Sequence, residues 1–264
     1  MNLLNTYTSF FAMLLIASSF FAYSPPAKEK TTIFRGEKMV YNVSYGFINA
    51  GEVMVSVDSQ FVKVDSNICF KAEITARTKG VAGFFSKIND VWISYIDSAS
   101  FLSYRFVRNQ QENNYTLREN TEFDRSTKQA LVTRMKENNA FELKTYPISA
   151  NVQDMVSAYF GLRSNQGEKL RTNDTVSFDV FLEDTTFHLQ MKYLGKERLR
   201  TKLGKIKAYK FSPIIPHTKN SVLSDENPIL TWISADEYRI PLKIKVNTKY
   251  GDVEANIEEY RKGY

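Results

Sequence analysis

Few side chains in this sequence have the types and spacing that catalysis requires. The 264 residues include two histidines, His188 and His217, and one cysteine, Cys69. Nucleophilic hydrolysis needs a base, usually histidine, beside a serine or cysteine. His188 lies in an alternating, strand-like segment, His217 lies in a proline-containing loop, and no Gly-x-Ser-x-Gly motif is present. The sequence therefore argues against a catalytic triad.

Metal and cofactor sites have equally little support. Ligands for metal ions come from clustered His, Cys or carboxylate groups. The chain has no His-x-x-x-His pair, no dense aspartate loop and no glycine-rich phosphate loop. Cys69 stands in the apolar phrase Ile68-Cys69-Phe70 and is expected to be a small buried hydrophobe. We expect no cofactor and no metal, and one cysteine permits no intramolecular disulfide.

Two aspartates follow the only two tryptophans. Trp92-Ile93-Ser94 runs on to Asp97, and Trp232-Ile233-Ser234 runs on to Asp236. Paired carboxylates can perform acid–base catalysis, so a glycan or cell-wall hydrolase is conceivable if Asp97 and Asp236 face one cleft. Aspartates at strand ends more often bind turn amides, and this structural role is the favoured interpretation.

Positive charge is concentrated in one segment. Eight Lys or Arg residues lie between Lys192 and Lys210 against the single acidic Glu197, within a chain of net charge +6. If this segment is a strand, Arg198, Arg200 and Lys202 point to the same face. The favoured interpretation is a solvated face or a protected sheet edge, and the alternative is contact with anionic lipid headgroups. No aromatic stacking motif accompanies the charges, so a nucleic-acid partner is not expected.

The first 27 residues carry no charged side chain, and Phe10 to Phe21 is an apolar run. This run is too short for a comfortable membrane span and suits the core of a signal peptide. We predict a signal peptide over 1–24, a linker over 25–32 and a periplasmic or otherwise exported protein. An uncleaved anchor or a buried N-terminal helix is the alternative.

After the linker, alternating apolar residues and turn signals predict antiparallel strands throughout. The expected strands are 37–45, 53–57, 68–78, 90–97, 102–108, 115–124, 129–135, 175–182, 186–194, 197–203, 205–211, 229–234, 241–249 and 253–260. A proline-containing loop over 212–228 is long enough to be a lid. The predicted fold is all-β: a strongly curved antiparallel sheet or incomplete barrel formed by a single domain, 33–264.

One helix is predicted, over 151–163. Val152, Met155, Val156, Tyr159 and Phe160 recur at helical spacing and form one apolar face. Asn151 could cap this helix, while Asp154 and Arg163 suit the two ends of its dipole. We expect the helix to cover the concave side of the sheet.

The order of strand signals suggests that the chain is an internal duplication, with halves of about 33–150 and 170–264. Asp174 to Val180 matches Glu37 to Val43 in pattern, and each half then contains a hairpin and a Trp-Ile-Ser strand. Alternating patterns also recur by chance in all-β chains, so the duplication stays open.

With these motifs in view, the chain resembles the bacterial envelope proteins of the domain of unknown function 3108 family. The phrases that carry the resemblance are Gly36-Glu37-x-x-x-Tyr41-x-x-x-Tyr45 with Ala50-Gly51, Asp154-x-x-Ser157-Ala158-x-x-x-x-Arg163, Trp232-Ile233-Ser234-x-Asp236-x-x-Arg239-x-Pro241, and a final hairpin at Gly251. The resemblance covers nearly all of the chain after residue 32. It implies an exported, mainly antiparallel β protein and carries over no catalytic residue.

The leading functional hypothesis is a non-enzymatic periplasmic protein that binds an apolar or amphipathic ligand such as lipid or glycolipid. This hypothesis rests on the rich supply of aromatic residues, the single covering helix, the loop over 212–228 and the absence of catalytic groups. The candidate ligand-binding residues are Trp92, Trp232, Phe84, Phe85, Tyr159 and Phe160. Phe84 and Phe85 follow glycines and would either pack under the sheet or form an apolar lip. A structural or assembly protein of the envelope with a filled core is the alternative.

Overall fold

The computed structural model describes residues 33–136, 139–164, 169–215 and 227–264. The predicted signal peptide and linker lie outside the described residues, as do His217 and most of the loop predicted over 212–228. The side chains of Phe84 and Phe85 also lie outside the description, so their predicted contact with a ligand stays a prediction. Among the described residues, no helix is long and apolar enough to cross a membrane.

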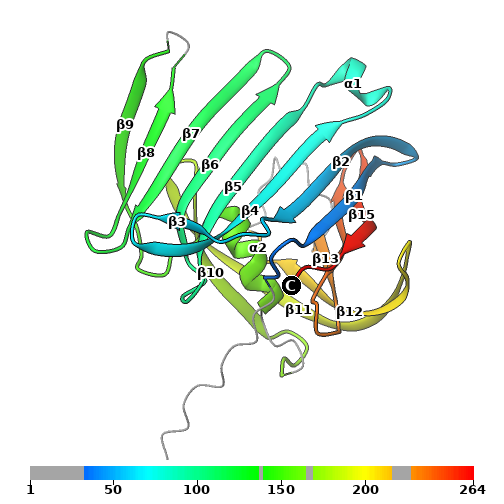
Figure 1. Ribbon diagram of the computed structural model, residues 1–264. Helices are drawn as coiled ribbons and strands as arrows, with labels where there is room; N and C mark the ends of the chain where they lie inside the picture. Colours follow the sequence, from blue (N-terminus) through cyan, green and yellow to red (C-terminus); the bar gives the residue numbers. More distant parts are fainter. Residues whose placement is uncertain (1–32, 137–138, 165–168, 216–226) are drawn as a thin grey trace, which may run out of the picture. The chain divides into compact units, whose positions relative to one another are not determined.

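The described residues form one antiparallel sheet of fifteen strands (Figure 1). Before the main helix the strands are β1 (Lys38–Tyr45), β2 (Ile48–Val57), β3 (Val62–Val64), β4 (Asn67–Thr78), β5 (Asn89–Asp97), β6 (Ser103–Glu112), β7 (Tyr115–Asp124), β8 (Gln129–Met135) and β9 (Phe141–Pro147). After it come β10 (Thr175–Leu182), β11 (Thr185–Thr201), β12 (Gly204–Pro213), β13 (Ile229–Ser234), β14 (Pro241–Thr248) and β15 (Gly251–Arg261). The helices are α1 (Ala82–Phe85) and α2 (Met155–Ser164).

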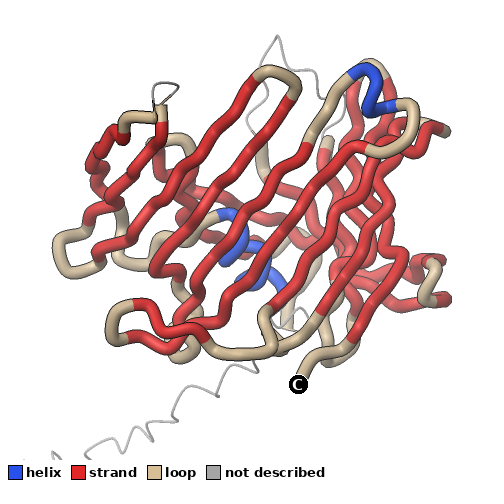
Figure 2. Tube along the Cα trace, turned by 45° about the horizontal axis from the view of Figure 1, so that its top comes forward, coloured by secondary structure: helices blue, strands red, loops and turns tan. Residues whose placement is uncertain are grey.

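The sheet consists of two meanders, and they meet in the middle of the sheet. The strand order is β10-β11-β12-β13-β14-β15-β1-β2-β4-β5-β6-β7-β8-β9, with β3 paired only to β4. β15 pairs with β1, so the last strand joins the first, and β9 and β10 remain as the two edges. Figure 2 shows the strands curving around α2. The prediction of a curved antiparallel sheet that does not close into a barrel is confirmed.

Two predicted strands, 186–194 and 197–203, are in fact one strand, β11, of 17 residues. Its register against β12 shifts between Tyr193 and Gly195, and Gly195 has φ +113°. A glycine in this conformation inserts a bulge and lets the strand continue. The predicted break between residues 194 and 197 is therefore a bulge within one strand. The short β3 and the edge strand β9 were not predicted.

Helix α2 starts later than predicted, and Asn151 does not cap it. The Oδ1 of Asp154 accepts the backbone N–H groups of Val156 at 2.7 Å and Ser157 at 2.8 Å, so Asp154 is the N-cap. Val152 precedes the helix, and Met155 is 43% exposed and does not belong to the buried face. The apolar face that packs on the sheet is carried by Val156 and Phe160.

Apolar side chains of the sheet and of α2 pack together in the core. One apolar cluster joins α2 to strands of both meanders and includes Met39, Phe106, Phe160, Leu242 and Ile257. A second cluster, around Tyr193, Tyr209, Phe211 and Ile233, packs on β11–β13. Cys69 is fully buried, as predicted. These clusters bury enough apolar surface to hold a sheet whose edges do not meet.

Side chains and a short backbone contact connect the two open edges. Gln153 forms an isolated parallel bridge with Val180 of β10. The guanidinium of Arg134, on β8, binds both carboxylate oxygens of Asp184, in the β10–β11 turn, at 2.8 and 2.5 Å. The same guanidinium donates to Glu119 at 2.6 Å. The hydrogen bond from Arg134 lowers the pKa of the Asp184 carboxyl below its ordinary value.

We expect Asp184→Asn to lower the free energy of unfolding at neutral pH by about 1 kcal/mol, because the pair is only partly screened from solvent. The folded-state pKa of Asp184 is depressed, so its contribution is present above the unfolded pKa of about 3.9 and is lost as the pH falls through the folded value. Urea unfolding at several pH values measures this. The difference in free energy of unfolding between the parent protein and Asp184→Asn should become smaller as the pH is lowered.

Glu183→Gln is the matched control for this measurement. Glu183 neighbours Asp184 in the same turn, but its side chain is 75% exposed and only one oxygen approaches Arg108, at 3.7 Å. Its substitution should change stability by less than about 0.5 kcal/mol. A deficit of Asp184→Asn that is equally large at low pH would show that the ion pair does not connect the edges.

Candidate functional site

Two fully buried charged side chains, Glu37 and Arg163, form an ion pair. Glu37 immediately precedes β1, and Arg163 lies in the last turn of α2. The guanidinium binds the carboxylate through two hydrogen bonds, of 2.9 and 2.7 Å, and both side chains are 0% exposed. A bidentate pair of this kind fixes both distance and orientation. It ties the end of the helix to the middle of the sheet.

Arg163 also binds the turn between β13 and β14. Its Nε donates to the carbonyl of Arg239 at 3.0 Å, and one terminal nitrogen donates to the carbonyl of Tyr238 at 3.0 Å. Four of its five N–H donors thus have acceptors. Burial by itself lowers the pKa of the Arg163 guanidinium, but Glu37 outweighs burial and raises that pKa above its ordinary value.

Asp236 stabilises the β13–β14 turn, whose carbonyl groups accept hydrogen bonds from Arg163. Its Oδ1 accepts hydrogen bonds from the Ser234 hydroxyl at 2.7 Å and from the N–H groups of Tyr238 and Arg239 at 3.0 and 3.2 Å. Arg239 adopts a positive φ of 50°, which turns its carbonyl towards the guanidinium. Asp97 does the same for the β5–β6 connection, where its Oδ1 accepts the N–H groups of Ala99 and Ser100. Both aspartates therefore serve as turn residues.

A tyrosine layer lies beside the ion pair. The Tyr41 hydroxyl donates to the carbonyl of Pro241 at 2.9 Å and lies 3.4 Å from the Tyr159 hydroxyl. Burial raises the pKa of Tyr41 well above its ordinary value and that of Tyr159 to about 12. Both phenols thus stay neutral, and they link β1, α2 and β14.

Asp154 fastens the other end of α2. While its Oδ1 caps the helix, its Oδ2 accepts the Ser94 hydroxyl of β5 at 2.6 Å. The Ser103 hydroxyl of β6 lies 3.2 Å from the Ser94 hydroxyl, close enough to donate to it. Burial raises the pKa of the Asp154 carboxyl, and these hydrogen bonds act in the opposite direction. The helix is therefore anchored at its first turn to one meander and at its last turn to the junction of both.

Five of the residues that carried the family resemblance meet in one place. We call Glu37, Tyr41, Arg163, Arg239 and Pro241 the buried lock. Gly36 lies in the turn before β1, and Gly51 lies in β2, where an added Cβ would come within 2.5 Å of the Arg77 carbonyl. Sequence reasoning named these residues but did not pair them. Arg163 is a single charge at the end of an apolar run, but Glu37 stands next to Lys38, so no local pattern pairs the two residues.

The predicted ligand-binding residues that are described belong to, or pack against, the main apolar cluster between the sheet and α2. Trp232 is 5% exposed and Phe160 is 1% exposed, while Trp92 and Tyr159 are partly buried and pack on the same cluster. Trp92 lies on β5 and Trp232 on β13, the fourth strands of their meanders along the path β1-β2-β4-β5 and along β10-β11-β12-β13. Their role towards a ligand stays a prediction, as does the internal duplication.

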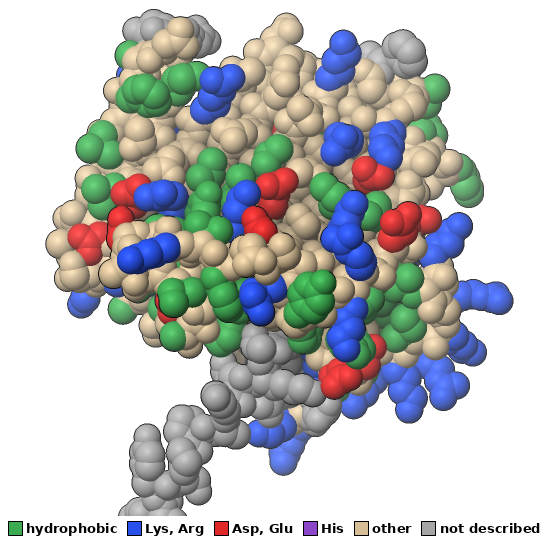
Figure 3. Space-filling view, in the orientation of Figure 1, with side chains coloured by type: hydrophobic (Ala, Val, Ile, Leu, Met, Phe, Trp, Pro, Cys, Tyr) green, Lys and Arg blue, Asp and Glu red, His purple; other side chains and the backbone are tan. Residues whose placement is uncertain are grey.

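The basic segment forms an exposed face on the β11–β12 hairpin. Arg198 lies directly opposite Lys207, and Arg200 lies directly opposite Lys205, so four exposed cations share one face. We call these four residues the basic face. Lys and Arg side chains gather at the lower right of Figure 3, where Figure 1 draws this hairpin. A hollow of about 490 Å³ is lined by Arg198, Arg200, Thr201, Gly204 and Lys205.

Lys202 does not share this face as predicted. The strand ends at Thr201, Lys202 falls in the turn, and its Nζ lies 3.9 Å from a carboxylate oxygen of Glu258 on β15. Within the described residues, no ion pair joins any member of the basic face to a carboxylate. The opposite face of the hairpin is apolar and packs Leu199 and Ile206 on the main cluster.

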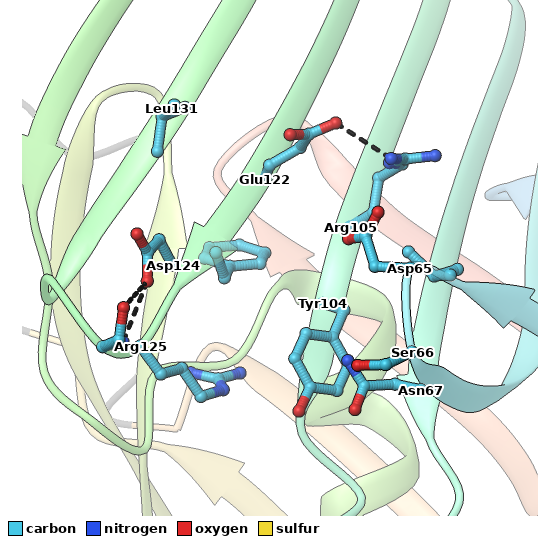
Figure 4. A pocket seen from close by; sticks show the side chains of 12 residues that line it. Asp65, Ser66, Asn67, Tyr104, Arg105, Glu122, Asp124, Arg125 and Leu131 are labelled. Carbon is cyan, nitrogen blue, oxygen red and sulfur yellow. Dashed lines mark hydrogen bonds and ion pairs between the residues drawn. The ribbon is translucent and has the colours of Figure 1, made fainter.

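A second hollow, of about 610 Å³, lies beside the β3–β4 turn (Figure 4). Its lining combines both signs of charge: Arg105 pairs with Glu122 at 3.0 Å, and Asp124 accepts hydrogen bonds from Ser126. Arg125 directs its guanidinium to the carbonyls of Ser103 and Val152. No group of three or more His, Cys, Asp or Glu side chains in the described ranges is placed to hold a metal ion.

The architecture is that of an open antiparallel β-barrel with one helix in its concavity. The chain belongs to the family described as "Protein of unknown function (DUF3108)", whose profile matches residues 40–258. No curated protein matches the chain.

Similar solved structures include a β-barrel-like protein of the domain of unknown function DUF1849 from Brucella abortus. It has 7% identity and a TM-score of 0.55, covering 88% of this chain and 100% of that chain. A protein with a YmcC-like fold from Bacteroides fragilis has 12% identity and a TM-score of 0.35, covering 86% and 96%. At such identity the first likeness supports the fold alone, and the second carries no argument.

Breaking the buried lock should be costly. Arg163→Met leaves Glu37 buried without its partner and should lower the free energy of unfolding by about 3–5 kcal/mol, and Glu37→Met should do the same to Arg163. The double variant should lose much less than the sum, because neither charge is then left unpaired. Denaturant unfolding of the four proteins measures the coupling.

Lys79→Met provides the comparison with an exposed pair. Lys79 and Glu52 lie 2.5 Å apart but are 49% and 27% exposed, so the loss should stay below about 1 kcal/mol. Strict additivity of the two lock substitutions would show that the pair does not couple the helix to the sheet.

Proposed function

We propose that this protein is a non-enzymatic component of the bacterial cell envelope that binds anionic headgroups of lipid or glycolipid through its basic face. The observation that carries the proposal is the direct opposition of like charges, Arg198 with Lys207 and Arg200 with Lys205. Like charges directly opposite each other destabilise a strand pair. An anionic partner seated between them would offset that cost.

The form of the hairpin supports a headgroup as the partner. The hollow over the basic face is lined by two arginines and a lysine, and arginine suits bidentate contact with phosphate or carboxylate oxygens. The apolar face of the hairpin packs on the main cluster, so the charged face is the one that can contact the partner. Core side chains of the sheet pack against α2, which favours binding at the surface over enclosure of an acyl chain.

The sequence supports a location in the cell envelope, because the uncharged leader predicts export. Anionic lipids are present at membrane surfaces, where each nearby Lys or Arg contributes about 1 kcal/mol to binding. The non-enzymatic part of the proposal rests on the scarcity of histidine and cysteine. It also rests on the use of Asp97 and Asp236 by turn amides.

A structural or assembly role in the envelope is the second candidate. The observation that favours it is the packed apolar core with its buried lock, which suits a rigid scaffold. This role predicts a stable protein partner in crosslinking, and it does not require lipid.

Vesicle binding tests the first proposal. The protein should sediment with vesicles containing phosphatidylglycerol and not with pure phosphatidylcholine, and added salt should weaken binding. Arg198→Gln/Arg200→Gln removes two charges, about 2 kcal/mol, and should lower the partition coefficient roughly 30-fold. Because the opposed charges are relieved, the same variant should be at least as stable as the parent protein in urea.

Lys63→Gln/Lys249→Gln is the matched control. It removes the same net charge from two exposed lysines outside the basic face and should bind vesicles nearly as well as the parent protein. Equal loss of binding in both double variants would show that net charge, and not the basic face, determines vesicle binding. Absence of binding to anionic vesicles would refute the proposal and leave the scaffold role.

A further inference from the structure

The edge strand β9 has the properties of an unfilled pairing site. Its sequence is Phe-Glu-Leu-Lys-Thr-Tyr-Pro, and within the described residues it pairs only with β8. The opposite edge, β10, is partly covered by the bridge from Gln153. Figure 1 draws β9 at the outer margin of the sheet, with no described strand beyond it.

The hydrogen-bond alternation shows which backbone groups of β9 are free. Ile148 N–H donates to the Lys128 carbonyl at 3.0 Å, and Lys136 N–H donates to the Ala140 carbonyl at 2.8 Å. These two bonds mark the closely spaced pairs of the β8–β9 ladder, which recur at every second residue. The even-numbered residues of β9 therefore bind β8. The N–H and carbonyl groups of Phe141, Leu143 and Thr145 point away from it.

The same residues expose apolar side chains. Phe141 is 73% exposed and Leu143 is 63% exposed, on one face of the strand. Natural edge strands usually discourage pairing with proline, inward charges or coverage. Proline occurs in β9 only at its last position, 147, which leaves the three outward N–H donors intact. A free backbone edge next to exposed apolar side chains is a template for another strand.

We propose that β9 pairs antiparallel with β9 of a second copy of this chain, about a two-fold axis through Leu143. This register makes Leu143 face its own counterpart and Phe141 face Thr145 of the second copy, so all outward backbone groups are paired. It also places Glu142 opposite Lys144 of the second copy, twice by symmetry. Sites between hydrogen-bonded pairs bring side chains closest together. The charge pattern of β9 is thus complementary to itself.

The charges involved are available for this exchange. Glu142 currently lies 3.4 Å from both Lys136 and Lys144 of its own chain, and both lysines are about half exposed. Lys144 can turn to the second copy while Lys136 keeps Glu142 partnered. The proposal is independent of lipid binding, because β9 and the basic face lie on different strands.

Charge exchange tests the pairing and its register together. The protein produced from the full sequence should be dimeric in sedimentation velocity. Glu142→Lys sets lysines against Lys144, and Lys144→Glu sets glutamates against Glu142, so each should raise the dissociation constant roughly tenfold or more. The double variant should recover the dimer. An equimolar mixture of the two single variants should form a mixed dimer, which general damage to the fold would not produce.

Leu143→Pro gives a second, independent test. The Leu143 N–H points outward, so proline at this edge position should leave the β8–β9 ladder in place and abolish dimerisation, with an unchanged circular dichroism spectrum. Lys249→Glu, far from β9 in sequence and exposed, should leave the dimer intact. A monomeric parent protein would overturn the proposal, as would a dimer that survives both single charge reversals. Capture of an extended peptide from another protein in place of the second copy would equally overturn it.

Discussion

The buried pair of Glu37 and Arg163 is the interaction on which the rest of the structure depends. It joins three parts of the chain that are distant in sequence: the entry to β1, the end of α2 and the β13–β14 turn. Removing two charges from water costs several kcal/mol per ion. That cost is offset only because nearly every donor of the guanidinium is satisfied. The main effect of the buried lock is therefore to fix one arrangement of β1, α2 and the β13–β14 turn. Its net contribution to stability is smaller.

An arrangement of this kind is needed because the sheet does not close. A closed barrel fixes its curvature by hydrogen bonding its last strand to its first. Here the first and last strands pair in the middle of the sheet, and β9 and β10 do not pair with each other. Curvature must then be held from within. The helix does this, with Asp154 fastened to β5 and Arg163 fastened to the centre of the sheet.

Strand positions were readable from the sequence because alternation is local: β7, β8, β10 and β13 match the predicted ranges. Long-range facts were not readable. The union of β15 with β1, the pairing of Glu37 with Arg163 and the edge position of β9 depend on which segments meet in space. Local exceptions to the pattern also led to wrong predictions. The sequence was divided into two strands where the single strand β11 continues through a bulge at Gly195, and Asn151 was predicted to cap the helix that Asp154 caps. The opposition of charges on the basic face became visible only with the β11–β12 register.

The lock and the basic face are physically continuous. The N–H of Ala235, in the turn that Arg163 binds, donates to the Lys207 carbonyl at 2.8 Å, and the Arg239 guanidinium lies 4.7 Å from the centre of the Tyr209 ring on β12. The turn therefore supports the base of the hairpin whose outer part carries the opposed cations. Because neighbouring like charges repel, such a hairpin needs a rigid base to keep them on one face. The buried pair of Glu37 and Arg163 holds the turn that supports this hairpin. Residues of the family motifs are thereby connected to the basic face.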